Sequence, residues 1–569
     1  MKTVKFISAS GKEFCIPQKS VAHIDSKKCI NCNECREACP VGAIEESQRV
    51  ICHACPECTE KPGLSPKKFV ALATERSCTT ACPLGISPQG YVNLLKCGKE
   101  KEAYQVIWKK NPLMEVCGSI CHHPCEQDCK RGILVDHPIH IRGLKRYLSE
   151  TNTAEQPKYQ RIYDEEIAVI GAGPAGLTAG HYLAQAGYRV TIFESDKEAG
   201  GMLIHGIPKF RLSRDTVSKE IKQLEKAGLT IHYGEKINKY SMAKLMKEYD
   251  AVIVAAGTPI SRELTIKGFR TEGIFPAMKF MEMVNAEQKI RHHLGQMFTF
   301  EGGEAVIIGG GSVAVDVART AVRLGASKVT CVSAEQGKQI PAHPWEIQEA
   351  KDEGVVFEEG WTPQSYQYSA VTKLDAVKLE KVTGCGKRDD GSFYMDVDHE
   401  TTREIKADWV VLAIGQMAEE YWQEFRKADN VFWAGDIASG KCSVVDAMAS
   451  GREAALAADA YIRRREVRDA ASEHKLNQAE IQEKIYPYNL HKMNRPEVSQ
   501  IPLEERKHTF MEVEKTFTRE EAYMEAMACI GCGFQKVDPD KCIGCGTCRN
   551  VCPKGDVITM VPLEGGSEG

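Results

Sequence analysis

The sequence predicts an α/β protein with two Rossmann-like dinucleotide-binding domains, preceded by a helical iron-sulfur domain and flanked by ferredoxin-like modules at both termini. Three observations support this prediction. Two glycine fingerprints follow apolar segments in the middle of the chain, and cysteines recur at C-x2-C and C-x3-C spacing. The stretch KCINCNECREACP near the N-terminus has the same cysteine spacing as KCIGCGTCRNVCP near the C-terminus. With 569 residues, the chain is also too long for one hydrophobic core.

The composition is that of an ordinary globular protein, with 43% hydrophobic and 27% charged residues. A net charge of only −4 argues against nucleic acid as a main partner. The longest apolar stretches are broken by glycine and fall short of the ~20 residues that a membrane helix needs. The first residues also lack the apolar segment of a secretory signal. We therefore expect a cytoplasmic protein with no nucleic-acid or membrane partner.

Cysteine is the unusual residue of this composition, with 24 in the chain. In a large chain of a reducing compartment, clustered cysteines indicate metal ligation rather than disulfides. The spacing C-x2-C-x2-C-x3-C followed by proline is typical of 4Fe-4S ferredoxins, whereas C-x2-C pairs alone also suit zinc. We therefore interpret the two complete motifs as iron-sulfur loops.

The N-terminal module, residues 1–62, is expected to hold two clusters. In a two-cluster ferredoxin, the cysteine after the x3 step ligates the other cluster. By this rule, one expected ligand set is Cys39, Cys52, Cys55 and Cys58. The other set, Cys29, Cys32 and Cys35, lacks a fourth thiolate because position 62 is proline, and Cys15 is the expected replacement.

The C-terminal module, residues 521–569, follows a short expected helix that opens on a capping box of Thr518 and Glu521. One cluster is expected on the motif Cys542, Cys545, Cys548 and Cys552. A second is left open, because only the pair Cys529 and Cys532 remains, and zinc is an alternative for that pair. The charged segment 466–520 is expected to be a linker with some helix.

The first glycine fingerprint lies in EIAVIGAGPAGLTAGHYLAQAGYRVTIFES, which reads as strand, turn, amphipathic helix and second strand. Such glycines let the backbone approach a pyrophosphate at the N-terminus of the helix. An acidic residue about twenty positions later suits a ribose diol. The expected binding residues are Gly171, Gly173, Gly176 and Glu194.

The second fingerprint, in EAVIIGGGSVAVDVARTAVRLGASKVTCVSAEQ, repeats this design with Gly309, Gly311 and Ala314. Two such folds imply two dinucleotides. Further along, VFWAGDIASG supplies Gly435 and Asp436, and the aspartate is a candidate to hold the ribityl or pyrophosphate part of a flavin.

Several stretches resemble the small subunit of glutamate synthase and its relatives, which include the NAD(P)H-binding part of dihydropyrimidine dehydrogenase and the large subunit of the Nfn-type transhydrogenase. These stretches are GGMLIHGIPKFRL, AAGT, AIGQ, AGDIASGKCSVVDAMASGREAA, CTTACPLGI and NPLMEVCGSICHHPCEQDCKRG. The resemblance covers residues 75 to 465. It implies FAD on the first fingerprint, with Gly201 in its site, and NAD(P)H on a second domain inserted into the first.

On this resemblance we expect a helical iron-sulfur domain over 63–160, FAD-binding segments over 161–295 and 429–465, and an NAD(P)H-binding domain over 296–428. The helical domain would hold one or two clusters on Cys78, Cys82, Cys117, Cys121, Cys125 and Cys129. The family's further cysteine pair, just upstream of Cys78, is not in its usual place. In total, about four or five 4Fe-4S clusters are expected.

The nicotinamide is not decided by the sequence. Relatives that use NADPH usually carry arginines after the second strand, where this chain has Ser333, Ala334 and Glu335. A carboxylate favours the ribose diol of NADH and repels a phosphate, although Lys338 is available to bind one. The cysteines Cys331, Cys385 and Cys442 are isolated, so no redox-active C-x2-C pair is expected in the flavin body, and no acid-base residue is assigned.

The leading functional hypothesis is an NAD(P)H-dependent FAD and iron-sulfur subunit of a multi-subunit electron-transfer complex, of transhydrogenase or electron-bifurcating type. It would exchange hydride at FAD and single electrons with ferredoxin or other flavin and iron-sulfur subunits. The alternative enzyme is a glutamate synthase small subunit that supplies a separate amidotransferase. The alternative of another class is a zinc-binding scaffold protein.

Overall fold

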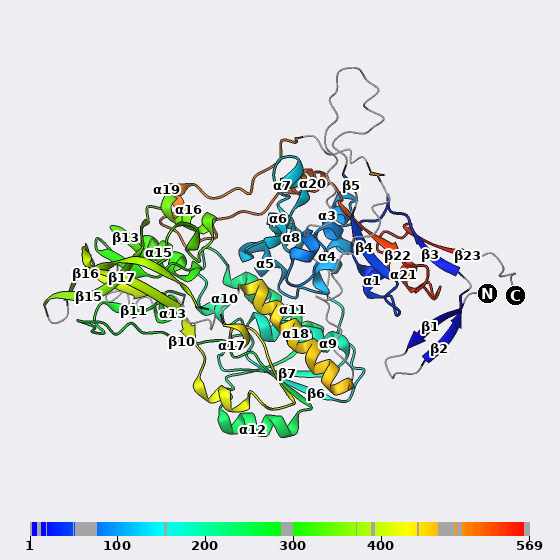
Figure 1. Cartoon of the computed structure of the whole chain (residues 1–569), viewed down its shortest axis with the longest axis horizontal. Coiled ribbons are helices and arrows are strands. Elements are labelled where there is room, and N and C mark those ends of the chain that lie inside the picture. Colours follow the sequence, from blue (N-terminus) through cyan, green and yellow to red (C-terminus); the bar gives the residue numbers. More distant parts are fainter. Residues whose placement is uncertain are drawn as a thin grey trace, which may run out of the picture. The chain divides into compact units, whose positions relative to one another are not determined.

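The computed structural model describes residues 3–7, 13–18, 20–48, 50–51, 77–152, 156–285, 300–370, 373–388, 393–440, 443–464, 484–485 and 492–562. The chain forms two compact units. The iron-sulfur unit comprises Met1–Gln156, Asp459–Val498 and Thr516–Gly569. The nucleotide unit comprises Pro157–Ala458 and Ser499–Lys515. Figure 1 labels their elements.

The nucleotide unit contains two parallel sheets of five strands each, in the orders β20-β9-β6-β7-β8 and β11-β18-β12-β13-β14. The first sheet consists of β6 (Glu166–Ile170), β7 (Arg189–Glu194), β8 (Thr230–Tyr233), β9 (Ala251–Val254) and β20 (Val431–Trp433). The second consists of β11 (Ile274–Pro276), β12 (Glu304–Ile308), β13 (Lys328–Ser333), β14 (Val356–Glu359) and β18 (Trp409–Leu412). The order with the first strand in the centre is that of a doubly wound nucleotide fold.

The second sheet is inserted into the first. Its strands lie in the chain between β9 and β20, which are neighbours in the first sheet. The short strands β10 (Ile260–Ser261) and β19 (Gln416–Met417) pair where the chain crosses between the two folds. Strand β11 falls within the range expected for the FAD domain but pairs with β18 of the second sheet. An antiparallel sheet of β15 (Trp361–Ala370), β16 (Lys373–Lys387) and β17 (Phe393–Lys406) is added to the second fold.

Helices follow the strands of both folds because their apolar faces cover the sheets. Those of the first fold are α9 (Pro174–Ala186), α10 (Met202–His205), α11 (Arg214–Ala227), α12 (Lys239–Glu248), α17 (Asp436–Ser439) and α18 (Val444–Arg463). Those of the second fold are α13 (Ala277–Asn285), α15 (Ser312–Arg323), η2 (Gly337–Gln339) and α16 (Pro344–Asp352), with η3 (Glu420–Phe425) after β19. Buried core residues such as Phe280, Ile307 and Val317 fill the second fold.

The segment 499–515, expected to be part of a linker, packs on the nucleotide unit. It contains α19 (Leu503–Arg506). Ile501 and Val513 are buried with Phe210, and the Val513 amide donates to the Phe210 carbonyl at 2.9 Å. These apolar contacts were not predicted, because Ile501 and Val513 are isolated apolar residues in a charged segment.

The iron-sulfur unit contains a helical part, whose described residues start at residue 77. Its helices are α2 (Cys78–Ala81), α3 (Pro88–Lys96), α4 (Glu100–Trp108), α5 (Met114–Ile120), α6 (Pro124–Gln127), α7 (Lys130–Leu134), α8 (Ile141–Thr151) and α20 (Arg519–Met527). Helix α20 opens on the expected capping box, with the Thr518 hydroxyl accepting from the Glu521 amide. Leu94, Ile107 and Leu144 are buried in the core of this part.

The two ends of the chain form one ferredoxin-like domain. Strand β3 (Ser20–Ile24) pairs antiparallel with β23 (Ile558–Pro562), and β4 (Ile44–Gln48) pairs antiparallel with β22 (Gly533–Val537). The short helices α1 (Glu34–Glu37) and α21 (Thr547–Asn550) lie between the strands of each half. In Figure 1 the blue strands of the N-terminal segment lie beside the red strands of the C-terminal segment.

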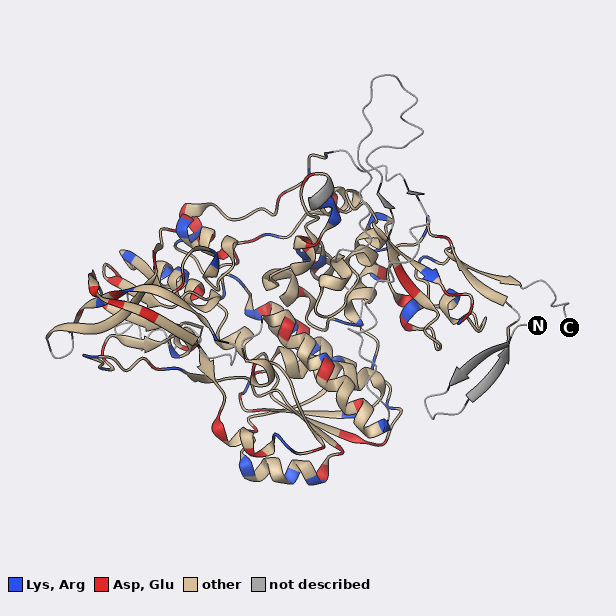
Figure 2. Cartoon of the chain, in the orientation of Figure 1, with Lys and Arg blue, Asp and Glu red and all other residues tan. Residues whose placement is uncertain are grey.

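Two further strand pairs complete the described part of this unit. Strands β1 (Thr3–Ile7) and β2 (Glu13–Pro17) form an antiparallel hairpin, and β5 (Val50–Ile51) pairs with β21 (Lys484–Ile485). Acidic and basic residues are interspersed along the helices and strands of both units (Figure 2). Within the described residues, no helix is long and apolar enough to cross a membrane.

Candidate nucleotide and iron-sulfur sites

The first glycine fingerprint forms a tight turn between β6 and α9. Gly171 has a φ of 95° and packs so closely that an added Cβ would lie 2.5 Å from the Ala255 carbonyl oxygen. At Gly176 an added Cβ would clash with the Gly171 carbonyl oxygen. Gly173 caps α9, and no atom lies within 4 Å of the position of its absent Cβ. The outer two glycines therefore shape the turn, while Gly173 leaves open space above the start of the helix.

Glu194, at the end of β7, lies against this turn. Its carboxylate accepts hydrogen bonds from the amide of Ala172 at 2.7 Å, the amide of Asp196 at 2.9 Å and the hydroxyl of Ser195 at 3.0 Å. The side chain is buried, and these donors satisfy its oxygens. This is the position from which an acidic residue binds a ribose diol in such folds.

The other expected flavin-binding residues lie around the same turn. An added Cβ at Gly201 would lie 3.2 Å from the Gly173 Cα atom, so this residue adjoins the middle glycine. Gly435 has a φ of 71°, and its absent Cβ faces Ala175 of α9 at 3.0 Å. Asp436 follows as the first residue of α17. The structure thus brings all the residues expected at the first fingerprint into one region.

The second fingerprint repeats this geometry in the inserted fold. Gly309 has a φ of 139°, and an added Cβ would clash with the Ala413 carbonyl oxygen. Gly311 caps α15 with open space at its Cβ position, and Ala314 is fully buried in the first turn of that helix. The close approach of helix and strand is the reason for small residues here.

Glu335 lies beside the second turn. The Ser333 hydroxyl donates to its carboxylate at 2.8 Å. An added Cβ at Gly310 would lie 3.2 Å from that carboxylate, which places it next to the fingerprint. Lys338, the alternative phosphate ligand, is exposed in η2. A negative charge therefore stands at the end of β13, where the ribose of a nicotinamide dinucleotide binds in this fold.

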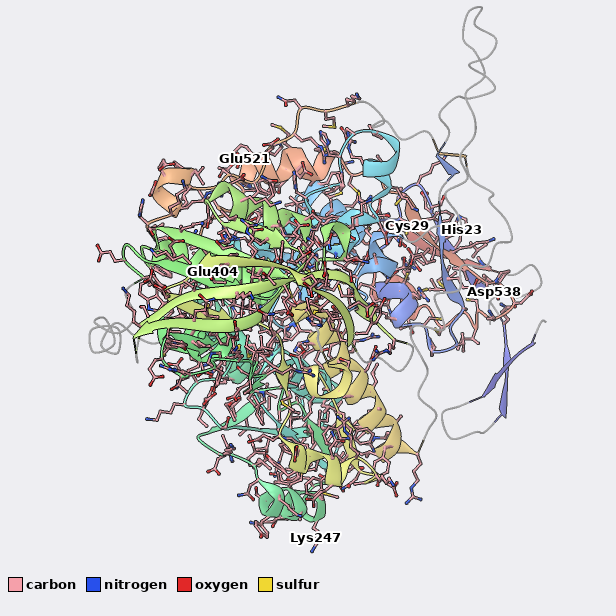
Figure 3. All side chains as sticks on the ribbon, turned by 60° about the vertical axis from the view of Figure 1, so that its left-hand side comes forward. His23, Cys29, Lys247, Glu404, Glu521 and Asp538 are labelled. Carbon is pink, nitrogen blue, oxygen red and sulfur yellow. The ribbon has the colours of Figure 1, made fainter. Side chains whose placement is uncertain are left out.

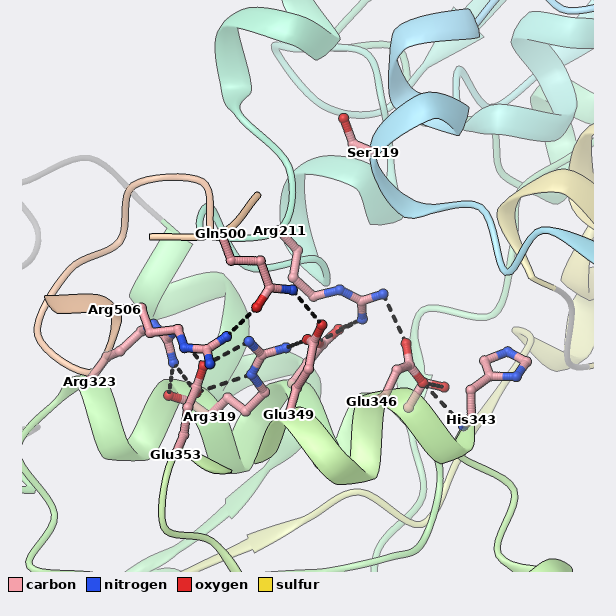
Figure 4. Close-up of polar contacts among 12 residues, drawn as sticks. Ser119, Arg211, Arg319, Arg323, His343, Glu346, Glu349, Glu353, Gln500 and Arg506 are labelled. Atoms are coloured by element: carbon pink, nitrogen blue, oxygen red, sulfur yellow. Dashed lines mark hydrogen bonds and ion pairs between the residues drawn. The ribbon is translucent and has the colours of Figure 1, made fainter. Parts of the chain in front are cut away.

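A buried ion-pair network joins the two folds of the nucleotide unit (Figure 4). Arg211 of the first fold binds Asp316 of α15 at 2.8 Å and Glu346 of α16 at 2.9 Å. Nearby, Arg319 and Arg323 both bind Glu353. Burial alone would raise the pKa of Glu353, but the hydrogen bonds from these two guanidinium groups hold it below its usual value. The network fixes the inserted fold against the glycine-rich segment that contains Arg211.

The cysteines of the ferredoxin-like domain form two sets, each drawn from both ends of the chain. One cavity is lined by Cys29, Cys32, Cys35 and Cys552. The amides of Asn31 and Gln535 donate to the Cys29 sulfur at 3.4 and 3.3 Å. Burial raises the pKa of Cys32 to about 12, and the thiols of Cys552 and Cys29 contribute to this shift. In Figure 3, Cys29 and His23 of the N-terminal segment lie in the same region as Asp538 of the C-terminal segment.

The second cavity of this domain is lined by Cys39, Cys542, Cys545 and Cys548. The amide of Ala43 donates to the Cys39 sulfur at 3.2 Å. Burial raises the pKa of Cys548 to about 11, and Cys542, Cys545 and Cys39 also raise it. Cys545 is exposed, so this set reaches the surface.

These sets correct the expected grouping. The fourth thiol beside the first N-terminal run is Cys552 rather than Cys15, and Cys39 adjoins the C-terminal run. In each motif the fourth cysteine lies with the first three of another motif, as the ferredoxin rule predicts, but that other motif is the one at the far end of the chain. Cys15 lies in β2, without a described side chain, and the expected ligands Cys52, Cys55 and Cys58 lie outside the described residues. The pairing of β3 with β23 and of β4 with β22 brings the two motifs together.

The helical part contains another thiol set around Lys145. Burial alone would lower the pKa of Lys145, but the thiolates of Cys121, Cys117, Cys125 and Cys82 raise it above its usual value. The amide of His123 donates to the Cys121 sulfur at 3.4 Å. A buried ammonium at this place would offset part of the negative charge that the four sulfurs carry as cluster ligands.

The remaining expected ligands lie at helix ends. Cys78 begins α2, Cys129 caps α7, and Cys529 and Cys532 follow α20. In the nucleotide unit, Cys331 is a buried core thiol, Cys385 is half-buried, and Cys442 lies outside the described residues. The cysteines whose side chains the structure describes form no disulfide bonds with one another.

The donor sets suit iron-sulfur clusters. Thiolates that surround a cube of iron and sulfide are spaced more widely than the ligands of one ion. Among the described residues, no three cysteine, histidine or acidic side chains lie close enough to hold a single metal ion. Backbone amides that donate to ligand sulfurs are a further feature of iron-sulfur sites. Likewise, the open space above Gly173 and Gly311 suits a pyrophosphate at each helix start.

Fold and sites together define an NAD(P)H-dependent flavin and iron-sulfur oxidoreductase. The profile of the pyridine nucleotide-disulphide oxidoreductases matches residues 165–451. The profile described as dihydropyrimidine dehydrogenase domain II, 4Fe-4S cluster, matches residues 71–157, and the 4Fe-4S binding domain matches residues 22–45 and 536–556. The chain belongs to this oxidoreductase family, in the group that includes the glutamate synthase small chain. Its cofactors are FAD, NAD(P)H and 4Fe-4S clusters.

Three relatives illustrate the group. The chain is 31% identical to the NADP(+)-dependent formate dehydrogenase subunit beta of Moorella thermoacetica, over 83% of this chain and 72% of that protein. It is 33% identical to the NAD-dependent dihydropyrimidine dehydrogenase subunit PreT of Escherichia coli (strain K12), over 69% of this chain and 92% of that protein. It is 28% identical to the glutamate synthase [NADPH] small chain of Azospirillum brasilense, over 68% of this chain and 86% of that protein.

Proposed function

We propose that the chain is the NAD(P)H-dependent subunit of a larger electron-transfer complex. FAD exchanges hydride with the nicotinamide, and 4Fe-4S clusters exchange single electrons, so the two together convert between a two-electron and a one-electron carrier. The observation that supports an onward transfer is the ferredoxin-like domain. It adds two thiol sets to those of the helical part, and one of them reaches the surface at Cys545.

The partner is proposed to be another flavin or iron-sulfur subunit, or a ferredoxin. The three relatives are described as subunits or chains of a formate dehydrogenase, a dihydropyrimidine dehydrogenase and a glutamate synthase. The formate dehydrogenase subunit matches over 83% of this chain, a larger share than the glutamate synthase chain. We therefore favour a dehydrogenase, transhydrogenase or electron-bifurcating assembly over delivery to an amidotransferase.

NADH is the proposed nicotinamide. The carboxylate of Glu335, oriented by Ser333 beside the second fingerprint, suits a free ribose diol and opposes a 2'-phosphate. The exposed Lys338 is the opposing feature, since a flexible ammonium there is available to a phosphate.

The function is tested on the full chain reconstituted anaerobically with iron, sulfide and FAD. NADH or NADPH should reduce the bound flavin and then a viologen dye, with the flavin-free protein as control. Absence of dye reduction with both nicotinamides would refute the proposal. Purification of the complex from its source then separates the partners: an amidotransferase subunit would support the glutamate synthase alternative over the one favoured here.

A further inference from the structure

The pair Cys529 and Cys532 belongs to neither ferredoxin motif. It stands between the end of α20 and the start of β22, at the C-x2-C spacing of a cluster loop. The Cys529 amide donates to the Ala526 carbonyl at 3.1 Å, which continues the last turn of the helix. Cys532 is buried and Cys529 is half-buried.

The helical part holds this segment on both sides of the pair. Arg131 is fully buried and donates to the Ala528 carbonyl at 2.8 Å. On the other side, the Gln89 amide group donates to the Gly533 carbonyl at 2.7 Å and accepts from the Gly533 amide at 2.8 Å. Both anchoring side chains are buried, so the pair has a defined position against the helices that follow residue 77.

The anchored pair lies beside two thiols of the helical part. Burial raises the pKa of Cys78, and the three thiols that raise it most in addition are Cys532, Cys129 and Cys529. Burial likewise raises the pKa of Cys532 to about 12, with Cys529 and Cys129 as the next contributors. The amide of Ile139 donates to the Cys129 sulfur at 3.5 Å, and the side-chain amide of Asn93 donates to the Cys529 sulfur at 3.6 Å. Arg131, two residues after Cys129, binds the carbonyl of the residue before Cys529, so the pair lies next to the Cys129 loop. The sulfurs of Cys129 and Cys529 each accept a hydrogen bond from an N–H group.

We propose that Cys78, Cys129, Cys529 and Cys532 hold one 4Fe-4S cluster, with two ligands from the helical part and two from the C-terminal segment. This inference rests on the proposed function and adds a ligand set to it.

This site lies between two of the other sets. On the side of the helical part, Cys78 also lies near Cys125, which contributes to its raised pKa. Cys125 is a member of the set around Lys145. Towards the ferredoxin-like domain, Gln89 contacts the segment of Cys532, while its neighbour Gly90 packs so closely on Cys32 that an added Cβ would lie 2.7 Å from the Cys32 Cα atom.

Four thiol sets therefore form a series within the iron-sulfur unit. Their order is Cys82, Cys117, Cys121 and Cys125; then Cys78, Cys129, Cys529 and Cys532; then Cys29, Cys32, Cys35 and Cys552; and last Cys39, Cys542, Cys545 and Cys548. The proposed cluster is the connection between the helical part and the domain that reaches the surface.

The test compares the reconstituted full chain with the double variant Cys529→Ser with Cys532→Ser. Its matched control is Cys97→Ser, since Cys97 is an exposed thiol outside the four sets. Because a 4Fe-4S cluster contains four irons, the double variant should lose about four irons and about four sulfides per chain, and the control none. The variant Cys78→Ser with Cys129→Ser should lose the same irons, and all four substitutions together should lose no more.

Low-temperature EPR separates this loss from misfolding. In the double variant, dithionite should still reduce the ferredoxin-like clusters, whereas NAD(P)H should reduce the flavin but no longer those clusters. The inference would be overturned if the double variant kept its full iron content, or if the site bound zinc instead of iron. It would also be overturned if the four substitutions together removed about eight irons, since that would mean two separate clusters. A wild-type chain whose flavin does not respond to NAD(P)H would refute the proposed function, while the iron counts would still decide the ligand set.

Discussion

The nucleotide unit and the iron-sulfur unit assemble their binding loops over very different distances along the chain. In the first fingerprint, the Ala172 amide binds Glu194, 22 residues away. In the ferredoxin-like domain, the Gln535 amide binds the Cys29 sulfur, 506 residues away. A substitution in a nucleotide loop should therefore affect one cofactor locally. A substitution in a cysteine loop should instead affect a thiol set that contains residues from both ends of the chain.

The largest effect on activity, complete loss of the flavin, is expected at the first fingerprint, where two neighbouring glycines test the local character of the loop. Gly176→Ala places a methyl group against the Gly171 carbonyl oxygen and should both remove FAD and destabilise the fold, by about 1–3 kcal/mol. Gly173→Ala meets no protein atom within 4 Å and should remove FAD, because the backbone can no longer approach the pyrophosphate, at nearly unchanged stability. Flavin content and thermal unfolding distinguish them, and full iron content is expected in both.

The second effect tests the long-range character of the cysteine loops. Cys29→Ser and Cys552→Ser should each lose about four irons, and the double variant should lose no more than either single one, since both residues serve one cluster. Cys29→Ser combined with Cys542→Ser should lose about eight irons, because these residues belong to different sets. Iron analysis of the purified variants distinguishes a loss of about four irons from a loss of about eight. Additive losses in the first pair would contradict the assignment of Cys552.

A third effect concerns the ion pairs within the nucleotide unit. Glu353→Gln leaves Arg319 and Arg323 without a carboxylate in a buried site and should destabilise the unit by about 3–5 kcal/mol at pH 7. Since the folded pKa of Glu353 lies below its usual value, its contribution is present above the unfolded pKa and is lost as pH falls through the folded pKa. The difference between wild type and variant in denaturant unfolding should therefore shrink in acid. Glu504→Gln, at an exposed position, is the control.

The smallest effect is a change of coenzyme preference. Glu335→Gln removes one negative charge at the second fingerprint and should raise kcat/KM for NADPH relative to NADH about tenfold, equivalent to about 1.4 kcal/mol. Glu404→Gln, at an exposed position of β17, is the control for loss of a negative charge in the same fold. Steady-state assays with both nicotinamides measure the ratio. An unchanged ratio would mean that Glu335 does not face the ribose.

The same difference in distance explains what the sequence could predict. The glycine turns, Glu194, and the capping box of Thr518 follow from residues close together in the chain, and the predicted α/β fold is confirmed. The exchange of Cys39 and Cys552 between the motifs depends on strand pairing between the two ends, which local spacing does not encode. The packing of 499–515 was missed for a related reason, because Ile501 and Val513 are isolated apolar residues in a charged segment.

The pairing of β3 with β23 also sets how much of the chain must be synthesised before the ferredoxin-like domain can form. At about 5–20 residues per second, the 506 residues between Cys29 and Gln535 take roughly 25–100 s to synthesise. During that interval Cys29, Cys32 and Cys35 have left the ribosome without Cys552, while the nucleotide-binding folds can already form. The thiol set of Cys29, Cys32 and Cys35 is thus completed only once Cys552 has been synthesised, so a chain that stops before this residue lacks one sulfur of that set.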